Sequence, residues 1–240
     1  MGACKIGDLY AVKTIMDELK TNDRDFSLMI NVQDENGNSP LHLAVMQGHI
    51  EITKILLKHN ASFNLENKEG KTPSQIQDEK GNSLLHVAVE NNHESVVEYL
   101  LENNANVNLS NHHNSAPLHI SSEHGYVRIT ELLLSNGAKT DLRDNDGDTP
   151  LLGCALGGNV QIAKILLQKD PSAIFSINSK KNSVLHYSAK VGNLKMTRFL
   201  LSQGASKVLK NSDDKTPEQV ALDNNHEEIA KVIADYFLSE

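Results

Sequence analysis

Residues 34–66 read DENGNSPLHLAVMQGHIEITKILLKHNASFNLE, and close copies of this stretch recur along the chain. The next copy, residues 78–110, reads DEKGNSLLHVAVENNHESVVEYLLENNANVNLS, and later copies begin at Asn111, Asp144, Asn178 and Asn211. Successive starts from Asp78 onward are 33 or 34 residues apart. A period of this length is typical of a solenoid, in which neighbouring repeats stack because no single repeat can bury its own apolar face.

Each copy carries signals for two helices joined by a tight turn. Ser39 and Pro40 form a helix start, since serine caps the first free N–H groups and proline fits the first turn, and we expect a short helix from Leu41 to Gln47. A second helix is predicted from Ile50, where apolar residues follow at helical spacing. The turn between the helices needs left-handed backbone, which glycine adopts readily, at Gly48, Gly125, Gly158 and Gly192. Gly137 and Gly204 close the second helix in two copies, and Asn60 and Asn104 take the same place in two others.

These residues resemble the ankyrin repeat. The family pattern of a turn, Thr-Pro-Leu-His, a first helix, a Gly-His turn, an apolar stripe ending in Leu-Leu and a closing Gly-Ala matches nearly the whole chain. The Leu-Leu pair recurs at 56–57, 100–101, 133–134, 166–167 and 200–201. The resemblance implies an all-α ankyrin-repeat solenoid of stacked helix-turn-helix units with hairpin fingers. It also implies that the histidines of the Leu-His position hold the hairpins, namely His42, His86, His119 and His186.

The repeats divide residues 1–240 as a single predicted domain. A truncated first repeat covers 1–33 and has helix segments around Ala3–Leu9 and Val12–Met16, followed by a polar linker over Lys20–Met29. Full repeats are predicted at 34–66, 78–110, 111–143, 144–177 and 178–210, and a C-terminal capping repeat at 211–240. Glu218 and the polar residues 223–225 suit a cap, because a terminal repeat needs a polar outer face.

Segment 67–77 departs from the pattern. Asn67 to Pro73 begin a repeat on schedule, yet the next repeat begins at Asp78, so this partial repeat has a finger and one helical turn but no second helix. Our hypothesis is that it loops out beside the finger row while the flanking repeats stack on each other. The alternative is that it interrupts the stack and makes a hinge.

Composition limits the possible functions. The 240 residues are 39% hydrophobic and 22% charged, which fits a folded protein, and the net charge of −8 argues against a general nucleic-acid binder or a binder of anionic membranes. No apolar run approaches the length of a membrane span. Two separated cysteines, Cys4 and Cys154, give no disulfide framework, and we expect a monomer in the reducing cytoplasm or the nucleus.

No motif in the chain supports catalysis, a cofactor or a metal site. His112, His113 and His124 share one repeat, but Glu123 is the only further ligand near them, and zinc needs about four. Gly70-Lys71-Thr72 lacks the first glycine of a phosphate-binding loop. The run 144–147 lacks the outer ligands of a calcium loop. The sequence therefore predicts a protein without enzymatic activity.

The resemblance implies that a protein partner binds the finger tips and the exposed face of the first helices. Carried over to this sequence, the contact residues are Met46, Gln47, Glu79, Glu90, Asn91, His112, His113, Glu123, His124, Asp146, Asp148, Leu156, Lys180, Lys190 and Val191. These positions run from acidic through apolar to basic. One interpretation is a solvated polar groove; the other is a partner with a basic segment followed by an acidic one.

Three functional interpretations stay open at this point. The first is an adaptor, inhibitor or assembly chaperone acting alone; the stretches Gly192–Met196 and Lys215–Ala221 are somewhat similar to gankyrin-type proteasome-assembly chaperones. The second is the ankyrin region of a larger channel, enzyme or effector. The third is a substrate of asparaginyl hydroxylases, since Asn64 and Asn108 resemble such sites but lack the usual acidic residue two positions before.

Overall fold

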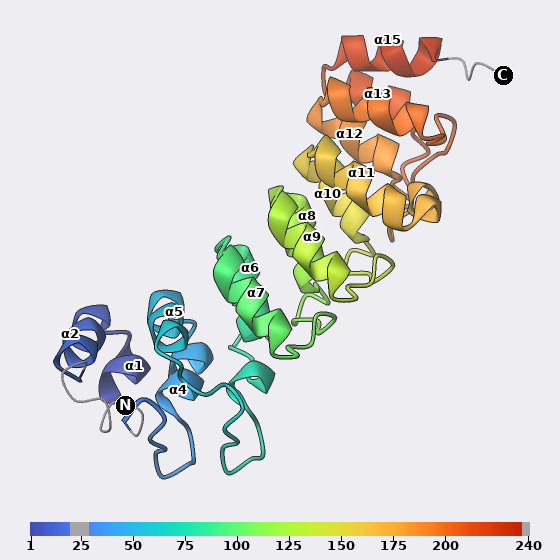
Figure 1. Ribbon diagram of the computed structural model, residues 1–240. Helices are drawn as coiled ribbons and strands as arrows, with labels where there is room; N and C mark the ends of the chain where they lie inside the picture. The colour runs from blue at the N-terminus through green and yellow to red at the C-terminus, as the bar shows by residue number, and fades with distance from the viewer. Residues whose placement is uncertain (20–28, 237–240) are drawn as a thin grey trace. The chain divides into compact units, whose positions relative to one another are not determined.

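The protein is built from short helices joined by hairpin loops, as a computed structural model shows for residues 1–19 and 29–236 (Figure 1). No strand occurs among these residues; two isolated β-bridges, Gln77–Ser83 and Ile177–Ser183, close the bases of two loops. The chain folds as two compact units, 1–112 and 113–240. The prediction of an all-α solenoid is confirmed, while the linker predicted over Lys20–Met29 lies almost wholly outside the described residues.

Among the described residues of unit 1, the helices form three pairs, accompanied by one 3-10 turn. The first helices of its repeats form an inner row, which comprises α1 (Gly2–Ile6), α4 (Pro40–Met46), η1 (Pro73–Gln75) and α6 (Leu84–Glu90). The second helices form an outer row, which comprises α2 (Leu9–Leu19), α5 (Ile50–Lys58) and α7 (Glu94–Glu102). Helix α1 contacts α4 in the inner row, and α2 contacts α5 in the outer row.

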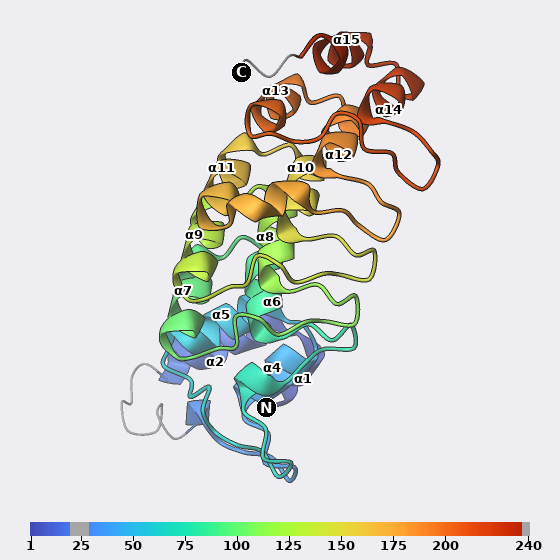
Figure 2. The same ribbon diagram turned by 90° about the vertical axis from the view of Figure 1, so that its right-hand side faces the viewer.

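Unit 2 repeats the same arrangement four times. Its inner row is α8 (Pro117–His124), α10 (Pro150–Gly157), α12 (Val184–Val191) and α14 (Pro217–Asp223). Its outer row is α9 (Val127–Ser135), α11 (Val160–Lys169) with the 3-10 turn η2 (Pro171–Phe175), α13 (Leu194–Ser202) and α15 (Glu227–Asp235). Each helix contacts its successor in the same row, and Figure 2 shows the hairpin fingers of the unit projecting to one side.

The core is a thin aliphatic layer between the two rows. Leucines of the first helices and of the Leu-Leu pairs are almost fully buried, among them Leu41, Leu56, Leu85, Leu100, Leu151 and Leu166. The predicted turn glycines and asparagines all have left-handed backbone. Gly157 has a different role, because a Cβ on it would lie 2.0 Å from the carbonyl oxygen of Glu123, so its missing side chain allows α10 to approach α8 closely.

Histidines join consecutive fingers, as the resemblance implied. The Ser39 N–H donates to Nδ1 of His42 (3.0 Å), and the ring's Nε2–H donates to the Lys71 carbonyl of the next finger (3.0 Å). His186 bonds in the same way to the Ser183 N–H (3.1 Å) and to the Lys215 carbonyl (3.0 Å). The ring must be neutral, because one nitrogen accepts while the other donates.

The repeat at 144–177 lacks this histidine, since Leu152 stands in its place. In three other repeats the serine hydroxyl before the helix bonds to histidine Nδ1, as Ser183 Oγ does to His186 (2.8 Å). With Leu152 fully buried instead, the Thr149 hydroxyl is buried and makes no hydrogen bond in the described part of the chain. The repeat therefore contains an unsatisfied buried hydroxyl, which costs free energy.

The partial repeat does not loop out, so our first hypothesis for it is wrong. Helix η1 contacts both α4 and α6 and thus occupies an inner-row position, because Pro73 and Ile76 are buried there. Its missing second helix leaves α5 and α7 as neighbours. Phe63 and Tyr99 meet edge to face at 5.6 Å, and His93 Nε2 lies 3.3 Å from the Glu51 carboxylate. The hinge stays a prediction.

Thr149→Val should stabilise the protein by about 1 kcal/mol, since it removes the unsatisfied hydroxyl and keeps the shape of the side chain. Ser183→Ala is the matched change at the same position of a repeat that has its histidine, and it should destabilise by about 1 kcal/mol. Urea unfolding of both variants measures the two free energies. Equal losses in both variants would contradict this explanation.

The stability should fall as the pH is lowered from 7.5 to 5.5. Burial lowers the pKa of His42, His119 and His186, against the opposing effect of their hydrogen bonds to carbonyls. In the unfolded chain these rings take up protons below a pH of about 6.5, whereas in the folded chain they stay neutral to lower pH. The unfolded state then binds more protons than the folded state. The contribution of the neutral rings to the free energy of unfolding is therefore complete above this pH range and is lost as the pH falls through it.

Thermal unfolding across this pH range checks the dependence. His186→Gln is the informative variant, because Gln75 and Gln219 occupy the same position in other repeats and cap their helices there. It should make unfolding less dependent on pH. A pH profile identical to that of the unmodified chain would count against a contribution from His186.

Candidate functional site

The finger tips are held by a side chain at the start of each finger. In unit 2, Asp144 Oδ1 accepts from the N–H groups of Asp146 (2.9 Å) and Asp148 (2.8 Å). Consecutive fingers are joined through the backbone, since Ser179 N–H donates to the Asp146 carbonyl (3.0 Å) and Ser212 N–H to the Lys180 carbonyl (2.9 Å). The tips are therefore fixed relative to the inner helices of the same unit.

An open hollow of about 480 Å³ lies between the fingers and inner helices of unit 2. Five predicted contact residues line it, namely Asp146, Asp148, Leu156, Lys180 and Lys190. The sequence did not single out several other residues there, including Tyr187 and Val220. The signal for Tyr187 was present, because other repeats have Leu43, Val87 or Ile120 directly after the histidine position and only this one has a hydroxyl.

Asp148 is not the exposed contact residue that its finger position suggested, because it is buried with 9% of its surface accessible. The Tyr187 hydroxyl donates to its Oδ2 (2.6 Å), and Asn178 Nδ2 donates to the tyrosine oxygen (3.0 Å). Burial raises the pKa of the Asp148 carboxyl, and its hydrogen bonds to Tyr187 and Asn178 oppose the shift. This network joins the fingers of Asp148 and Asn178 in the repeat that lacks its histidine.

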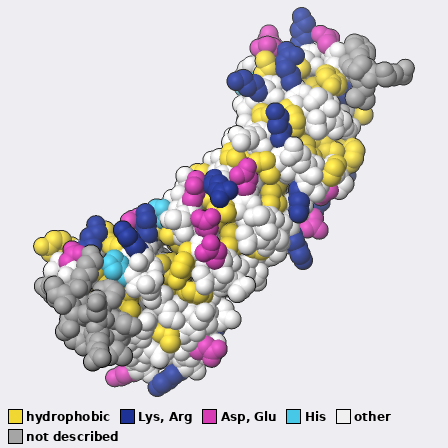
Figure 3. All heavy atoms as spheres, in the orientation of Figure 1, with side chains coloured by type: hydrophobic (Ala, Val, Ile, Leu, Met, Phe, Trp, Pro, Cys, Tyr) yellow, Lys and Arg dark blue, Asp and Glu magenta, His cyan; other side chains and the backbone are white. Residues whose placement is uncertain are grey.

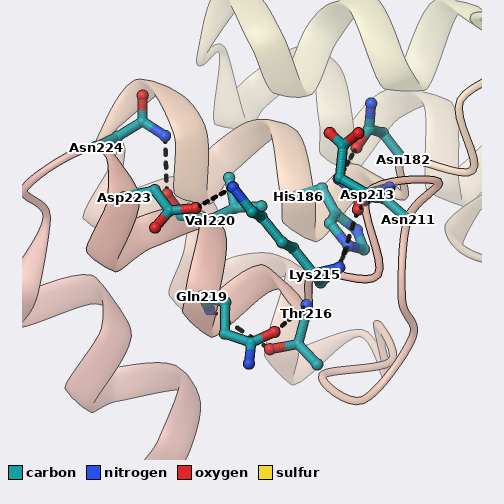
Figure 4. A network of polar contacts seen from close by, with 10 residues as sticks. All are labelled: Asn182, His186, Asn211, Asp213, Lys215, Thr216, Gln219, Val220, Asp223 and Asn224. Atoms are coloured by element: carbon teal, nitrogen blue, oxygen red, sulfur yellow. Dashed lines mark hydrogen bonds and ion pairs between the residues drawn. The ribbon is translucent and has the colours of Figure 1, made fainter.

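The lysines around this hollow differ in whether they already form an ion pair within the protein. Figure 4 shows that Lys215 is occupied, with Nζ 2.6 Å from Asp223 Oδ2 and its carbonyl bonded to His186. Lys180 and Lys190 are exposed and form no ion pair within the described residues. Val191, beside Lys190, is 40% exposed. On the face shown in Figure 3, by contrast, acidic and basic side chains are interspersed.

Unit 1 has a second hollow of about 630 Å³, lined by the predicted residues Met46, Gln47 and Glu79. Glu90 and Asn91 are exposed at the end of α6 and lie outside the lining of that hollow. Asn91 bonds through Nδ2 to the Val87 carbonyl (3.0 Å). The exposed His112 ends the unit, and its ring and backbone lie against Gly81 of the preceding finger.

The remaining predicted residues belong to the first repeat of unit 2. His113 is exposed on its finger, and Glu123 and His124 are exposed at the end of α8. The His124 ring stacks on Tyr126 with centroids 5.5 Å apart, and its Nδ1 lies 3.0 Å from the Ile120 carbonyl. All three lie outside the lining of the 480 Å³ hollow.

Both cysteines, Cys4 and Cys154, are buried. Burial raises the pKa of the Cys4 thiol and raises that of Cys154 to about 12, which disfavours the reactive thiolate. Within residues 1–19 and 29–236, no group of three or more His, Cys, Asp or Glu side chains is arranged to hold a metal ion. No helix in those ranges has the length and apolar character that crossing a membrane requires.

A family model for ankyrin repeats in three copies matches the chain over residues 1–111, 73–144, 118–211 and 171–239. The chain belongs to the ankyrin-repeat family. Ankyrin repeats are generally protein–protein interaction modules, and proteins built from them are typically without enzymatic activity. The family accounts for the paired helices and for the row of hairpin fingers.

Several ankyrin proteins share short segments with this chain. Ankyrin repeat domain-containing protein 13C of Danio rerio is 51% identical over 41 residues, which are 17% of this chain and 8% of that protein. Ankyrin repeat-containing protein P1E11.10 of Schizosaccharomyces pombe is 39% identical over 49 residues, 20% of this chain and 24% of that protein. The chain thus matches a quarter or less of the length of these curated relatives.

Asp148→Asn should stabilise the protein at pH 7 by about 1 kcal/mol, because it removes the cost of a buried charge and keeps an acceptor for Tyr187. The pKa of Asp148 is higher in the folded protein than in the unfolded chain, so protonation of this carboxyl stabilises the fold. This stabilisation is complete below the unfolded pKa of about 3.9 and is lost as the pH rises through the folded pKa. The gain of the variant should therefore shrink toward pH 4 in chemical unfolding. Asp146→Asn, at an exposed position of the same finger, is the control and should change little.

Proposed function

We propose that this ankyrin-repeat protein is a non-enzymatic scaffold that binds a protein partner through its finger tips and inner-row helices. The observation that carries the proposal is the convergence of five predicted contact residues, from two fingers and two helices, on one hollow of unit 2. Protein–protein interfaces typically have an apolar core and a polar rim. Leu156 and the charged residues of the fingers give this hollow that composition.

The charges of unit 2 indicate the chemistry of the partner. Lys180 and Lys190 are free to pair with carboxylates, and the half-buried Leu156 and exposed Val191 offer apolar contacts beside them. Glu123 and Asp146 precede them in the chain and are exposed. We infer a partner with a basic segment followed by an acidic one, in which aliphatic contacts supply most of the affinity and rim charges the association rate.

We further propose a monomer that acts in the cytoplasm or the nucleus and binds neither nucleic acid nor a cofactor. Two buried thiols and the net charge of −8 support this assignment. A second candidate is the same scaffold acting as the recognition region of a larger protein. The ankyrin repeat domain-containing 13C proteins of Danio rerio and Xenopus tropicalis favour it, because the segments similar to this chain are only 8% and 9% of those proteins.

The decisive variant is the double change Lys180→Glu and Lys190→Glu. A partner captured from the native organism with the unmodified protein should bind this variant at least tenfold more weakly, and the melting temperature should be unchanged because both side chains are exposed. Lys195→Glu, an exposed lysine of α13 in the outer row, is the matched control and should retain the affinity.

Charge reversal at Glu123 and Asp146 forms the second arm of the experiment. It should weaken the same complex without lowering the melting temperature. If both pairs of reversals leave the affinity unchanged, the proposed surface is not the binding site. If only one pair matters, the partner is recognised through a segment of one charge sign.

A further inference from the structure

The fingers of unit 1 are joined by a ladder of backbone hydrogen bonds. Lys68 N–H donates to the Asn36 carbonyl (2.9 Å), and His112 N–H donates to the Lys80 carbonyl (3.0 Å). Side-chain amides add a second rung at each step, as Asn67 does by donating to Asn38 (3.0 Å). At these two steps a backbone N–H of one finger thus bonds to a carbonyl of the finger before it, in the manner of adjacent strands.

One rung of this ladder is missing. By position in the repeat, Glu79 N–H should donate to the Glu69 carbonyl, but neither group makes a hydrogen bond within the described residues. Figure 2 shows the reason: the fingers at 34–38 and 67–71 lie side by side, apart from the finger at 78–82. The missing second helix of the partial repeat removes the spacing that would align the finger at Asp78 with its predecessor.

The 630 Å³ hollow of unit 1 lies at this break. Glu69 on one side and Glu79 on the other belong to its lining, with Met46, Gln47 and Ile76 between them. Met46 is 38% exposed there and offers an apolar surface. The hollow therefore presents a backbone acceptor, a backbone donor and an apolar contact.

The charges around the break give it no dominant sign. Lys71 Nζ lies 3.2 Å from Glu69 Oε2, and Asp78 Oδ1 accepts from the N–H groups of Lys80 and Asn82 (2.8 Å each). Lys68 and Glu79 remain, with opposite charges. Recognition at this place must therefore rest on the main chain and on apolar contact rather than on ion pairs.

We propose that the hollow binds an extended, uncharged segment of a partner protein, which supplies the missing rung. A carbonyl of the segment accepts from Glu79 N–H, an N–H of the segment donates to the Glu69 carbonyl, and one apolar side chain packs on Met46. Addition of a strand to an open edge is a recurrent mode of peptide recognition, in which main-chain bonds give affinity and a pocket gives specificity. This surface is independent of Lys180 and Lys190 in unit 2.

Glu79→Pro tests the main-chain bond directly. The turn 78–81 has Asp first, Gly last and a bond from Gly81 N–H to the Asp78 carbonyl (2.9 Å), and proline is favoured at its second position. The substitution should therefore keep the finger and remove only the N–H donor. Glu35→Pro is the matched control, because the turn 34–37 has the same Asp-Glu start and the same bond from the Gly37 N–H to the Asp34 carbonyl (2.9 Å). Asn36 of this turn lines the hollow, but Glu35 itself does not.

The probe is a phage-displayed library of random 12-residue peptides, selected on the full chain, with dissociation constants then measured by fluorescence anisotropy. Selected peptides should be low in charge and should bind Glu79→Pro and Met46→Glu at least tenfold more weakly than the unmodified chain. Glu35→Pro and the double variant of Lys180 and Lys190 should bind them unchanged. Circular dichroism melting of each variant verifies that the fold is retained.

Three results would overturn the proposal. The first is that no peptide is enriched, and the second is that enriched peptides bind Glu79→Pro as tightly as the unmodified chain. The third is concentration-dependent self-association that Glu79→Pro abolishes, which would assign the hollow to a second copy of the chain. None of these results bears on the proposed binding surface of unit 2. The variants of Lys180 and Lys190 test that surface separately, so a failure of either proposal can be told from a failure of the other.

Discussion

In several repeats a neutral histidine that bonds in two directions holds a hairpin finger to the next one, and the finger row depends on it there. In His42 and His186, Nδ1 accepts from a backbone N–H of the same repeat and Nε2–H donates to a carbonyl of the following finger. His119 does the same with Ala116 and Asp148. Because the fingers have few apolar contacts of their own, these bonds and the backbone ladder set where the finger tips lie.

Leu152 and Gln75 stand where other repeats have this histidine, and the two replacements affect the finger row differently. At Leu152 the finger row continues, because the Tyr187 hydroxyl bonds to Asp148 and Asn178 and joins the two fingers instead. At Gln75 the row ends: Oε1 accepts from Thr72 N–H (2.9 Å), but within the described residues the side chain bonds to no following finger. Gln219, in a second Lys-Thr-Pro-x-Gln motif, caps its helix in the same way, since its Oε1 accepts from the Thr216 N–H (2.9 Å).

Most of the fold could be predicted from the sequence, since repeat spacing, Pro-Leu-His and the Gly or Asn turns specify local structure directly. The position of segment 67–77 could not be predicted in this way. It depends on the burial of Pro73 and Ile76 between α4 and α6, and the sequence pattern does not reveal that packing. The burial of Asp148 was missed for a similar reason. Its partner Tyr187 is 39 residues away, and a finger position alone does not show that a hydroxyl of the next repeat will reach it.

Native-state hydrogen exchange of the finger amides tests most directly whether the ladder is interrupted at the partial repeat. The N–H groups of Lys68 and His112 are bonded to neighbouring fingers and should be protected, whereas Glu79 N–H should exchange at the rate of an exposed amide. Protection of Glu79 equal to that of Lys68 and His112 would show a continuous finger row. That result would contradict both the missing rung and the hollow that depends on it.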